Sequence, residues 1–339
     1  MTYRFSRSRR NALHALGALT AGTLATSWLA TLPRAAHGAA LQPVRLGYQY
    51  HLWGAPAVVA LKKGFFAAEG LTVDDRKFAS GVDTRNAMVG GAIDIGTVGI
   101  TPFIVGASRG ELVALATVCY AGKTALVMAR SGSGVKTISD LRGKRIASQV
   151  GSTLDDVFKK RIGPEANLTE KDYQIINVKF SDQVSALAAG SVDAMLNLEP
   201  FCSIAEERKL AVPLTDYFKY DLIPNMLTVN RPFVEKHPET CVAFLRAWLR
   251  AVELFAKQPQ EAASIMLGVY KEGGYEIGDA LVRRVIDRLV VTPDFIPELP
   301  AYMNSQATAL RDAKRIQTVP DAAAVLLKEP LANARAKRS

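Results

Sequence analysis

Asp83–Thr101, which reads DTRNAMVGGAIDIGTVGIT, recurs as DQVSALAAGSVDAMLNLEP at Asp182–Pro200. The two segments share four positions: Asp83 with Asp182, Ala87 with Ala186, Gly91 with Gly190, and Asp94 with Asp193. Each segment predicts a short helix that ends at a glycine and is followed by an apolar strand. The loop after such a strand lies at the carboxyl end of an open α/β sheet, where ligands bind. The pair therefore predicts two similar α/β lobes facing a cleft, although helix, glycine and strand recur in any α/β protein.

The size and composition are those of a globular protein of about two domains, with 339 residues, 49% of them hydrophobic and 22% charged. The formal net charge of +10 includes five arginines within residues 1–40, which contain no acidic residue, so the remainder carries +5. Such mild basicity argues against nucleic-acid binding. Cys119, Cys202 and Cys241 are too widely spaced for a disulfide framework or a metal site. We therefore expect no metal and no cofactor.

Residues 1–40 have the pattern of a cleaved export signal. Arginines precede an apolar run, Ala15–Leu32, and small residues follow at Ala35–Ala40. Ser8–Leu13 resembles the twin-arginine pattern, and the general export route remains an alternative. An uncleaved membrane anchor fits less well, because the run is rich in Gly, Ala and Thr and ends in a processable site. We expect cleavage after Gly38 or Ala40 and a periplasmic mature protein.

Alternating strand and helix patterns divide the rest of the chain. Strands are expected at 44–48, 71–78, 93–98 and 112–120, with a helix over 56–69 after the first of them. A second set of strands is expected at 124–129, 146–149, 175–180 and 210–214, together with the second repeat. Residues 223–229 are expected to return the chain from the second set of strands to the first. Helices follow at 232–236, 238–257, 259–270, 277–290 and 300–313, before a solvated basic tail. The predicted fold is α/β with two lobes, each a sheet flanked by helices, joined by a two-strand hinge. Lobe one comprises 41–122 plus 224–339, and lobe two comprises 123–223.

Gly151, Ser152 and Thr153 lie between a strand and a helix, so their backbone N–H groups can hold an oxyanion at the helix start. A simple helix cap is the alternative, because Ser152 and Thr153 each precede an aspartate by three residues. Gly99 and Thr101 form the matching helix start in lobe one.

Other candidate ligand contacts follow strands or lie where the chain passes between the lobes. Aromatic and amide side chains orient organic ligands in clefts, although a self-packed loop is an alternative. Glu199 either holds a ligand amine or serves as an acid at the start of a helix. These candidates are Gln49, Tyr50, His51, Trp53, Ser80, Gly81, Tyr120, Asn197 and Glu199.

Several short segments, in this order and spacing, resemble the periplasmic solute-binding proteins of ABC importers that serve sulfonates, taurine, nitrate and pyrimidine precursors. The segments are Leu46–Gln49, Lys63–Phe66 ahead of Gly70–Leu71, Gly91–Gly96, Asp140–Lys144, Gly151–Thr153 and Glu199–Phe201. The resemblance covers nearly all of residues 43–260. It implies a type II periplasmic binding protein fold that closes on one small ligand, and delivery to a membrane permease driven by a cytoplasmic ATPase. It implies no catalytic residue, and we expect a monomer.

The resemblance leaves the ligand open. Leu198-Glu199-Pro200 stands where sulfonate and taurine binders usually carry Trp-Asp-Pro, which weighs against a sulfonate. A sulfonate-type or related oxyanion is favoured, with a pyrimidine or flavin precursor or an aromatic carboxylate as alternatives. A ligand-sensing module for a membrane receptor is a further alternative. Fungal pyrimidine-synthesising enzymes share the fold, but they need a reactive histidine and a cysteine cluster, and here the three cysteines are dispersed.

Overall fold

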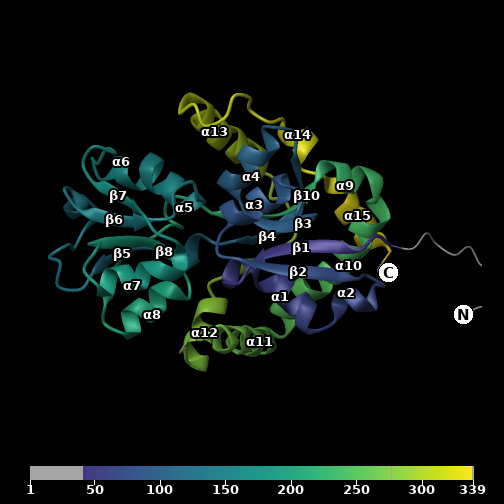
Figure 1. Cartoon of the computed structure of the whole chain (residues 1–339), viewed down its shortest axis with the longest axis horizontal. Coiled ribbons are helices and arrows are strands. Elements are labelled where there is room, and N and C mark those ends of the chain that lie inside the picture. The colour runs from purple at the N-terminus through teal and green to yellow at the C-terminus, as the bar shows by residue number, and fades with distance from the viewer. Residues whose placement is uncertain (1–40, 276, 338–339) are drawn as a thin grey trace, which may run out of the picture. The chain divides into compact units, whose positions relative to one another are not determined.

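Two β-sheets organise the structure, a computed structural model that describes residues 41–275 and 277–337 (Figure 1). In these residues the first sheet has six strands in the order β11-β4-β10-β3-β1-β2, and the second has five in the order β7-β6-β8-β5-β9. The first comprises β1 Val44–Gln49, β2 Val73–Phe78, β3 Ile95–Gly99, β4 Leu112–Tyr120, β10 Pro224–Asn230 and β11 Val290–Val291. The second comprises β5 Ala125–Arg130, β6 Arg145–Ser148, β7 Gln174–Asn177, β8 Ala194–Leu198 and β9 Ala211–Asp216. We call the sheets, with the helices that connect their strands, lobe one and lobe two.

Helices flank both sheets, which confirms the predicted two-lobed α/β fold (Figure 1). Their bounds in lobe one and the C-terminal region are α1 Ala55–Lys62, α2 Phe65–Ala68, α3 Gly81–Val89, α4 Ile100–Ala107, α9 Arg231–Lys236, α10 Pro238–Lys257, α11 Pro259–Glu272, α12 Asp279–Ile286, α13 Leu299–Asp312, α14 Ala322–Val325 and α15 Lys328–Ala336. Those in lobe two are α5 Thr153–Val157, α6 Gly163–Glu165, α7 Gln183–Ala188 and α8 Phe201–Glu207.

The two sheets share one topology. Without β11, the first reads β2-β1-β3-β10-β4 and the second β7-β6-β8-β5-β9. In each, the fourth strand runs antiparallel to both neighbours and comes from the other part of the chain: β10 follows lobe two, and β5 follows β4. The chain consequently passes between the sheets twice, after Tyr120 and again between Asp216 and Pro224.

The repeated aspartate has a structural role that is the same in both lobes. Asp94 accepts hydrogen bonds from the backbone N–H and the guanidinium of Arg45, which also donates to the carbonyl of Gly91 at 2.6 Å. In the second copy, Arg145 and Asp193 make the same set of contacts. The pairs tie β1 to the turn before β3 and β6 to the turn before β8. The repeat in the sequence thus reflects two equivalent strand anchors.

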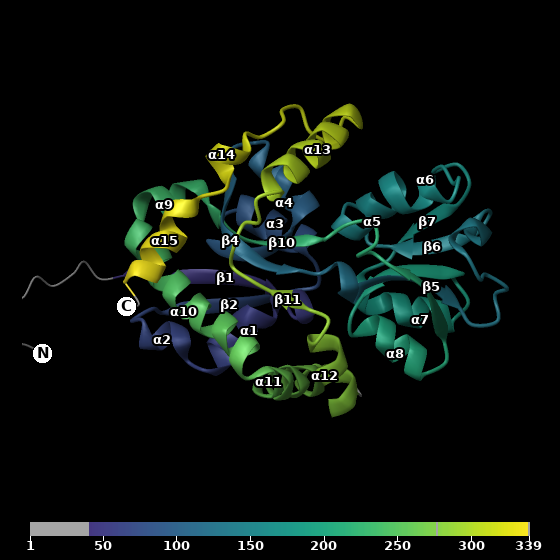
Figure 2. The same ribbon diagram turned by 180° about the vertical axis from the view of Figure 1, so that it is seen from behind.

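The main core of lobe one lies between its sheet and α10, which packs against α1, α2 and α15 (Figure 2). α10 begins at Pro238 and carries apolar residues at helical spacing, so that one face is buried. Phe244 of this face stacks on Phe66, with ring centroids 4.6 Å apart, and Trp248 is fully buried beside it.

Three local predictions were wrong. The helix expected over 56–69 is divided into α1 and α2, because Gly64 adopts a left-handed conformation with φ of 67°. The helix expected over 277–290 ends at Ile286, and Val290–Val291 instead pair with β4 as strand β11. The basic C-terminus is helix α15 rather than a solvated tail. Its Arg335 pairs with Asp294, and Leu331 is buried.

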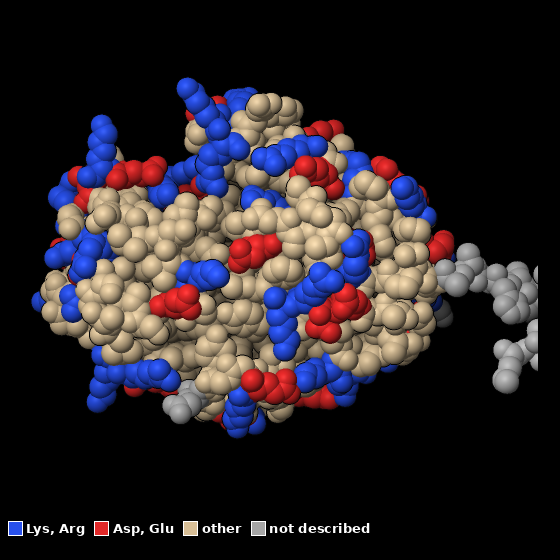
Figure 3. Space-filling model, in the orientation of Figure 1, with Lys and Arg blue, Asp and Glu red and all other residues tan. Residues whose placement is uncertain are grey.

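The expected export signal, with its twin-arginine motif and cleavage site, lies outside the described residues and stays a prediction. Within 41–275 and 277–337, none of the helices has the length and apolar character needed to cross a bilayer. Figure 3 shows basic and acidic side chains intermixed over the face that it draws. This mixture agrees with the absence of a nucleic-acid footprint in the sequence.

Candidate functional site

The two predicted helix starts lie against each other between the lobes. The backbone N–H of Thr101, in the first turn of α4, donates to Oγ1 of Thr153 in α5 at 3.3 Å, and the Thr101 hydroxyl donates to Asp156 at 3.2 Å. A Cβ on Gly99 would lie 2.8 Å from Oγ1 of Thr153, so glycine permits this approach. The carboxyl ends of β3 and β6 therefore meet at one place, as expected for a ligand cleft.

The start of α5 is a capped helix with its own negative charge. Ser152 accepts from the backbone N–H of Asp155 at 3.2 Å, and Asp155 accepts from the N–H of Gly151 at 3.1 Å. Asp155 and Asp156 are buried and are paired with cations, among them Lys159 at 3.1 Å. These contacts are the ones expected if Ser152 serves as the cap of helix α5. An oxyanion placed here would lie close to two carboxylates.

The aromatic loop after β1 also reaches lobe two. The ring of His51 lies edge-on to Phe180, with centroids 6.3 Å apart, and to Trp53 at 5.7 Å. Nε1 of Trp53 donates to Oγ1 of Thr124 at 3.0 Å, where the chain passes between the lobes. Burial, together with the nearby Tyr50, raises the pKa of Tyr275, which follows α11. The loop is thus enclosed by residues from three separate parts of the chain.

His51 is neutral, and the contacts of its ring define its tautomer. The side chain is 1% exposed, and burial lowers its pKa to about 3. Nδ1 accepts from the backbone N–H of Trp53, at 3.4 Å, so the proton of the neutral ring resides on Nε2. Nε2 is buried and has no hydrogen-bond partner among the described residues.

Protein contacts occupy Gln49, the last residue of β1, and Asn197, near the end of β8. The Gln49 amide accepts from the hydroxyl of Thr97 and donates to its carbonyl. The Asn197 amide donates to the carbonyl of Phe180 at 3.0 Å and accepts from the N–H of Leu198 at 2.8 Å. Both side chains are buried and hold the neighbouring loops in position.

Ser80, Gly81 and Tyr120 lie near the same region and have structural contacts. Ser80 caps α3 by accepting from the N–H of Asp83 at 3.2 Å. A Cβ on Gly81 would lie 2.8 Å from the backbone nitrogen of Gly99, so these two glycine loops are in close contact. The Tyr120 hydroxyl donates to the carbonyl of Asp294 and accepts from a neighbouring backbone N–H, which ties β4 to the loop before α13.

Glu199 caps helix α8 and pairs with a distant arginine. Its carboxylate, 1% exposed, accepts from the N–H and hydroxyl of Ser203 at 3.0 and 2.9 Å, and from Nη1 of Arg288 at 3.3 Å. Burial raises the pKa of Glu199, while Ser203 and Arg288 act in the opposite direction. Glu199 is therefore an acid at the start of a helix, and its contact with a ligand amine stays a prediction.

Sequence reasoning missed four residues that border this region: Phe180, Gln183, Tyr275 and Arg288. Gln183 is fully buried in the first turn of α7. Its Nε2 donates to the carbonyl of Val178 at 3.1 Å, and its Oε1 has no partner among the described residues. Phe180 could have been found from the repeat, because it precedes the second segment as Ser80 and Gly81 precede the first. Tyr275 and Arg288 come from the helical region, where no pattern marks them.

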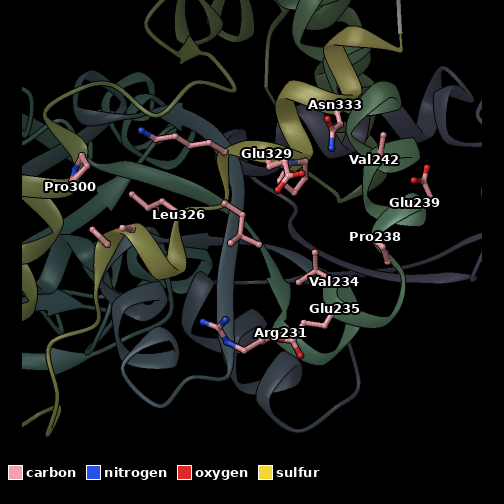
Figure 4. Close-up of a pocket in the computed structure, with 15 residues that line it drawn as sticks. Arg231, Val234, Glu235, Pro238, Glu239, Val242, Pro300, Leu326, Glu329 and Asn333 are labelled. Atoms are coloured by element: carbon pink, nitrogen blue, oxygen red, sulfur yellow. The ribbon is translucent and has the colours of Figure 1, made fainter.

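A cavity of about 750 Å³ lies elsewhere, beside α9, α10, α14 and α15 (Figure 4). Apolar side chains such as Val234, Val242 and Leu326 line much of it, and none of the predicted site residues does. Of the charged residues that line it, Arg231 and Glu239 have partners in the protein. The region between the lobes is the better candidate site, because buried polar atoms there have no partner among the described residues.

Residues 54–262 match the family described as NMT1/THI5 like. An aliphatic sulfonates-binding protein of Bacillus subtilis is 29% identical over 231 residues, which are 66% of this chain and 69% of that protein. The taurine-binding periplasmic protein of Escherichia coli is 28% identical over 224 residues, 64% of this chain and 68% of its own. A relative with a different activity is the 4-amino-5-hydroxymethyl-2-methylpyrimidine phosphate synthase of Uromyces fabae, 26% identical over 216 residues, 58% of this chain and 61% of that protein.

Solved structures share the fold. The alkanesulfonate-binding protein of Xanthomonas axonopodis pv. citri bound to MOPS superposes with a TM-score of 0.76 at 20% identity, covering 86% of this chain and all of that one. At such identity the likeness concerns architecture, and ligand choice depends on the site. The family match spans more than half of the 339 residues and includes strands of both sheets. The chain belongs to the NMT1/THI5-like family.

Proposed function

We infer that the chain is the extracytoplasmic solute-binding component of an ABC import system. It captures a small organic solute between the lobes, with a sulfonate-type or related oxyanion favoured, and delivers it to a membrane permease driven by an ATPase. The observation that carries this proposal is the meeting of both lobes around His51, whose buried Nε2 has no partner in the part of the chain that the structure describes. The names of the sulfonate- and taurine-binding relatives support the ligand class, and the periplasmic relative supports the location.

The site can hold an oxyanion through neutral donors. Burial lowers the pKa of Arg85, and the nearby charges of Arg109 and Arg315 lower it further. Glu111 and Asp83 lie near Arg85 as well and act on its pKa in the opposite direction, so the charges beside α3 are mixed. Inside the site, donation from His51 Nε2 stabilises an oxyanion without a guanidinium contact. Closure of the lobes excludes water, which strengthens these hydrogen bonds and makes the bound solute favour the closed state.

Binding alone is the proposed activity. The sulfonate and taurine relatives are binding proteins, and such a function needs no reactive group. All three cysteines are buried, and burial raises the pKa of the Cys119, Cys202 and Cys241 thiols, so none is a ready nucleophile. His51, with its pKa of about 3, is a poor general base near neutral pH.

A thermal-shift screen of residues 41–339 tests the proposal. The panel contains taurine, ethanesulfonate, nitrate, benzenesulfonate, benzoate, 4-amino-5-hydroxymethyl-2-methylpyrimidine and riboflavin. A solute at about a hundred times its Kd adds about 2.7 kcal/mol of stability, a shift of several degrees. A shift with a sulfonate supports the proposed class. Shifts limited to the pyrimidine or riboflavin would reassign the solute, and no shift across the panel would count against import of these compounds and favour the sensing alternative.

A further inference from the structure

We propose that His51 and Gln183 select a solute that carries both a hydrogen-bond acceptor and a hydrogen-bond donor. Nε2–H of His51 donates to the acceptor, and Oε1 of Gln183 accepts from the donor. The inference rests on the proposed function, because it assigns roles within the same site. It points to hydroxy- or amino-substituted oxyanions, such as 2-hydroxy- and 2-aminoethanesulfonate, in preference to plain alkyl oxyanions.

The donor follows from the geometry of the His51 ring. Nδ1 points toward its own loop and accepts from the N–H of Trp53. Nε2 is at the opposite end of the ring from the backbone, is completely buried, and has no partner within residues 41–275 and 277–337. A buried donor that makes no hydrogen bond is costly, so a stable closed state requires an acceptor there.

The acceptor follows from the contacts of Gln183. Its amide nitrogen donates to the Val178 carbonyl, which orients the group and directs Oε1 away from that bond. The side chain is fully buried, and Oε1 has no donor among the described residues. The same argument therefore requires a donor opposite Oε1 when the lobes are closed.

Phe180 brings the two groups close together. Its ring contacts His51 from across the lobes. Phe180 begins the short turn that leads directly into α7, and Gln183 is three residues further along. Residues three apart in helical geometry are neighbours, about 5–6 Å apart at Cβ. A molecule the size of taurine can therefore contact both His51 and Gln183.

Isothermal titration of residues 41–339 with isethionate (2-hydroxyethanesulfonate), taurine and ethanesulfonate tests the pair. The first two carry a donor beside the sulfonate, and the third carries none. We expect ethanesulfonate to bind about tenfold more weakly than isethionate, as for one hydrogen bond. Gln183→Met should weaken isethionate about tenfold and leave ethanesulfonate within about twofold. Gln174→Met, at an exposed glutamine of β7, is the matched control and should change neither.

Two substitutions isolate the His51 donor. His51→Asn retains an acceptor near the place of Nδ1 and removes the donor at the far end, so all three sulfonates should bind about tenfold more weakly. His51→Gln carries an amide nitrogen near the place of Nε2 and should retain affinity within about threefold. Thermal unfolding without solute checks that each variant is folded.

Equal losses for isethionate and ethanesulfonate in Gln183→Met would overturn the acceptor role, and equal losses in the two His51 variants would overturn the donor role. If none of the three sulfonates binds the wild type, the sulfonate class of the proposed function fails. The ¹⁵N shifts of the His51 imidazole in the same protein then decide the inference. An Nε2–H tautomer supports the donor role, and an Nδ1–H tautomer or a charged ring at pH 7 overturns it.

Discussion

The buried imidazole of His51 links protonation to folding. Its pKa is about 3 in the folded protein and about 6.5 in an unfolded chain, so between these values the unfolded state binds one more proton. Stability therefore falls as the pH falls through this window. From pH 7 to pH 5 we expect this residue to lower the free energy of unfolding by about 2 kcal/mol. Urea unfolding at both pH values measures the change.

His51→Gln removes this proton linkage, so its loss of stability between pH 7 and pH 5 should be smaller than that of the wild type by the same amount. His237→Gln, at a histidine outside the site, is the comparison and should keep the full dependence. Parallel pH profiles for the wild type and His51→Gln would show that the imidazole is accessible to protons in the folded state.

Gly99 permits the contact between the lobes. Its φ of −60° suits any residue, so Gly99→Ala leaves the backbone of lobe one unstrained. The added Cβ would lie 2.8 Å from Oγ1 of Thr153, so it opposes the approach of α5 to this loop. We expect solute affinity to fall about tenfold while the melting temperature of the solute-free protein changes little.

A second substitution separates this clash from general damage. Thr153→Ala in the Gly99→Ala background removes the opposing hydroxyl and should restore much of the affinity. Gly278→Ala is the neutral control, because a Cβ there meets no atom within 4 Å. Calorimetric titration with whichever panel compound shifts the melting temperature gives the affinities. A Gly99→Ala protein with wild-type affinity would mean that the bound state does not bring these loops together.

At the scale of elements, the segment from α11 to β11 spans the two lobes. It extends from helices that pack on lobe one and contacts lobe two twice: Tyr275 meets the ring of Phe201 at 5.7 Å, and Arg288 pairs with Glu199. Both partners lie at the start of α8. The segment therefore acts as a brace on the loop that ends β8.

The ion pair of this segment is suited to a double-mutant cycle with Arg288→Met and Glu199→Gln. Arg288 is 42% exposed in its side chain, which weakens the pair, and we expect a coupling of about 1 kcal/mol. Of the two single variants, Arg288→Met should be the less stable, because it leaves the buried carboxylate of Glu199 with fewer partners. Urea unfolding of the four proteins gives the coupling free energy. A value near zero would show that the ion pair does not brace the loop.

At the scale of the whole molecule, the contacts between the lobes include hydrogen bonds, an ion pair and ring contacts. The hydrogen bonds of Thr101 with lobe two and the His51–Phe180 contact can be made when the lobes close and released when they open. A solute that bridges the lobes shifts the population toward the closed state.

Small-angle scattering measures this shift. We expect the radius of gyration of residues 41–339 to decrease when a binding solute is added, and to decrease less for Gly99→Ala at the same concentration. A solute that binds by calorimetry but leaves the scattering curve unchanged would contradict closure as the basis of capture.

Local patterns predicted much of the fold because its determinants are local. The strands, the returning strand β10 and the exact bounds of α10 follow from hydrophobic periodicity and from the proline that begins that helix. The errors came where distant contacts prevail. Val290–Val291 form a strand because β4 offers a free edge, and the basic C-terminus becomes helical because Leu331 is buried in the interior.

The sequence by itself determined the two-lobed α/β fold and the loops that surround the site, because a strand followed by a small or aromatic loop marks the carboxyl edge of a sheet wherever the chain folds. Tertiary structure alone decided which side chains in those loops are free to meet a solute. Gln49 and Asn197 are fully engaged by their neighbours, whereas His51 and Gln183 each keep one buried atom that no described residue pairs with. That distinction depends on partners far apart in the chain, and no local pattern encodes it.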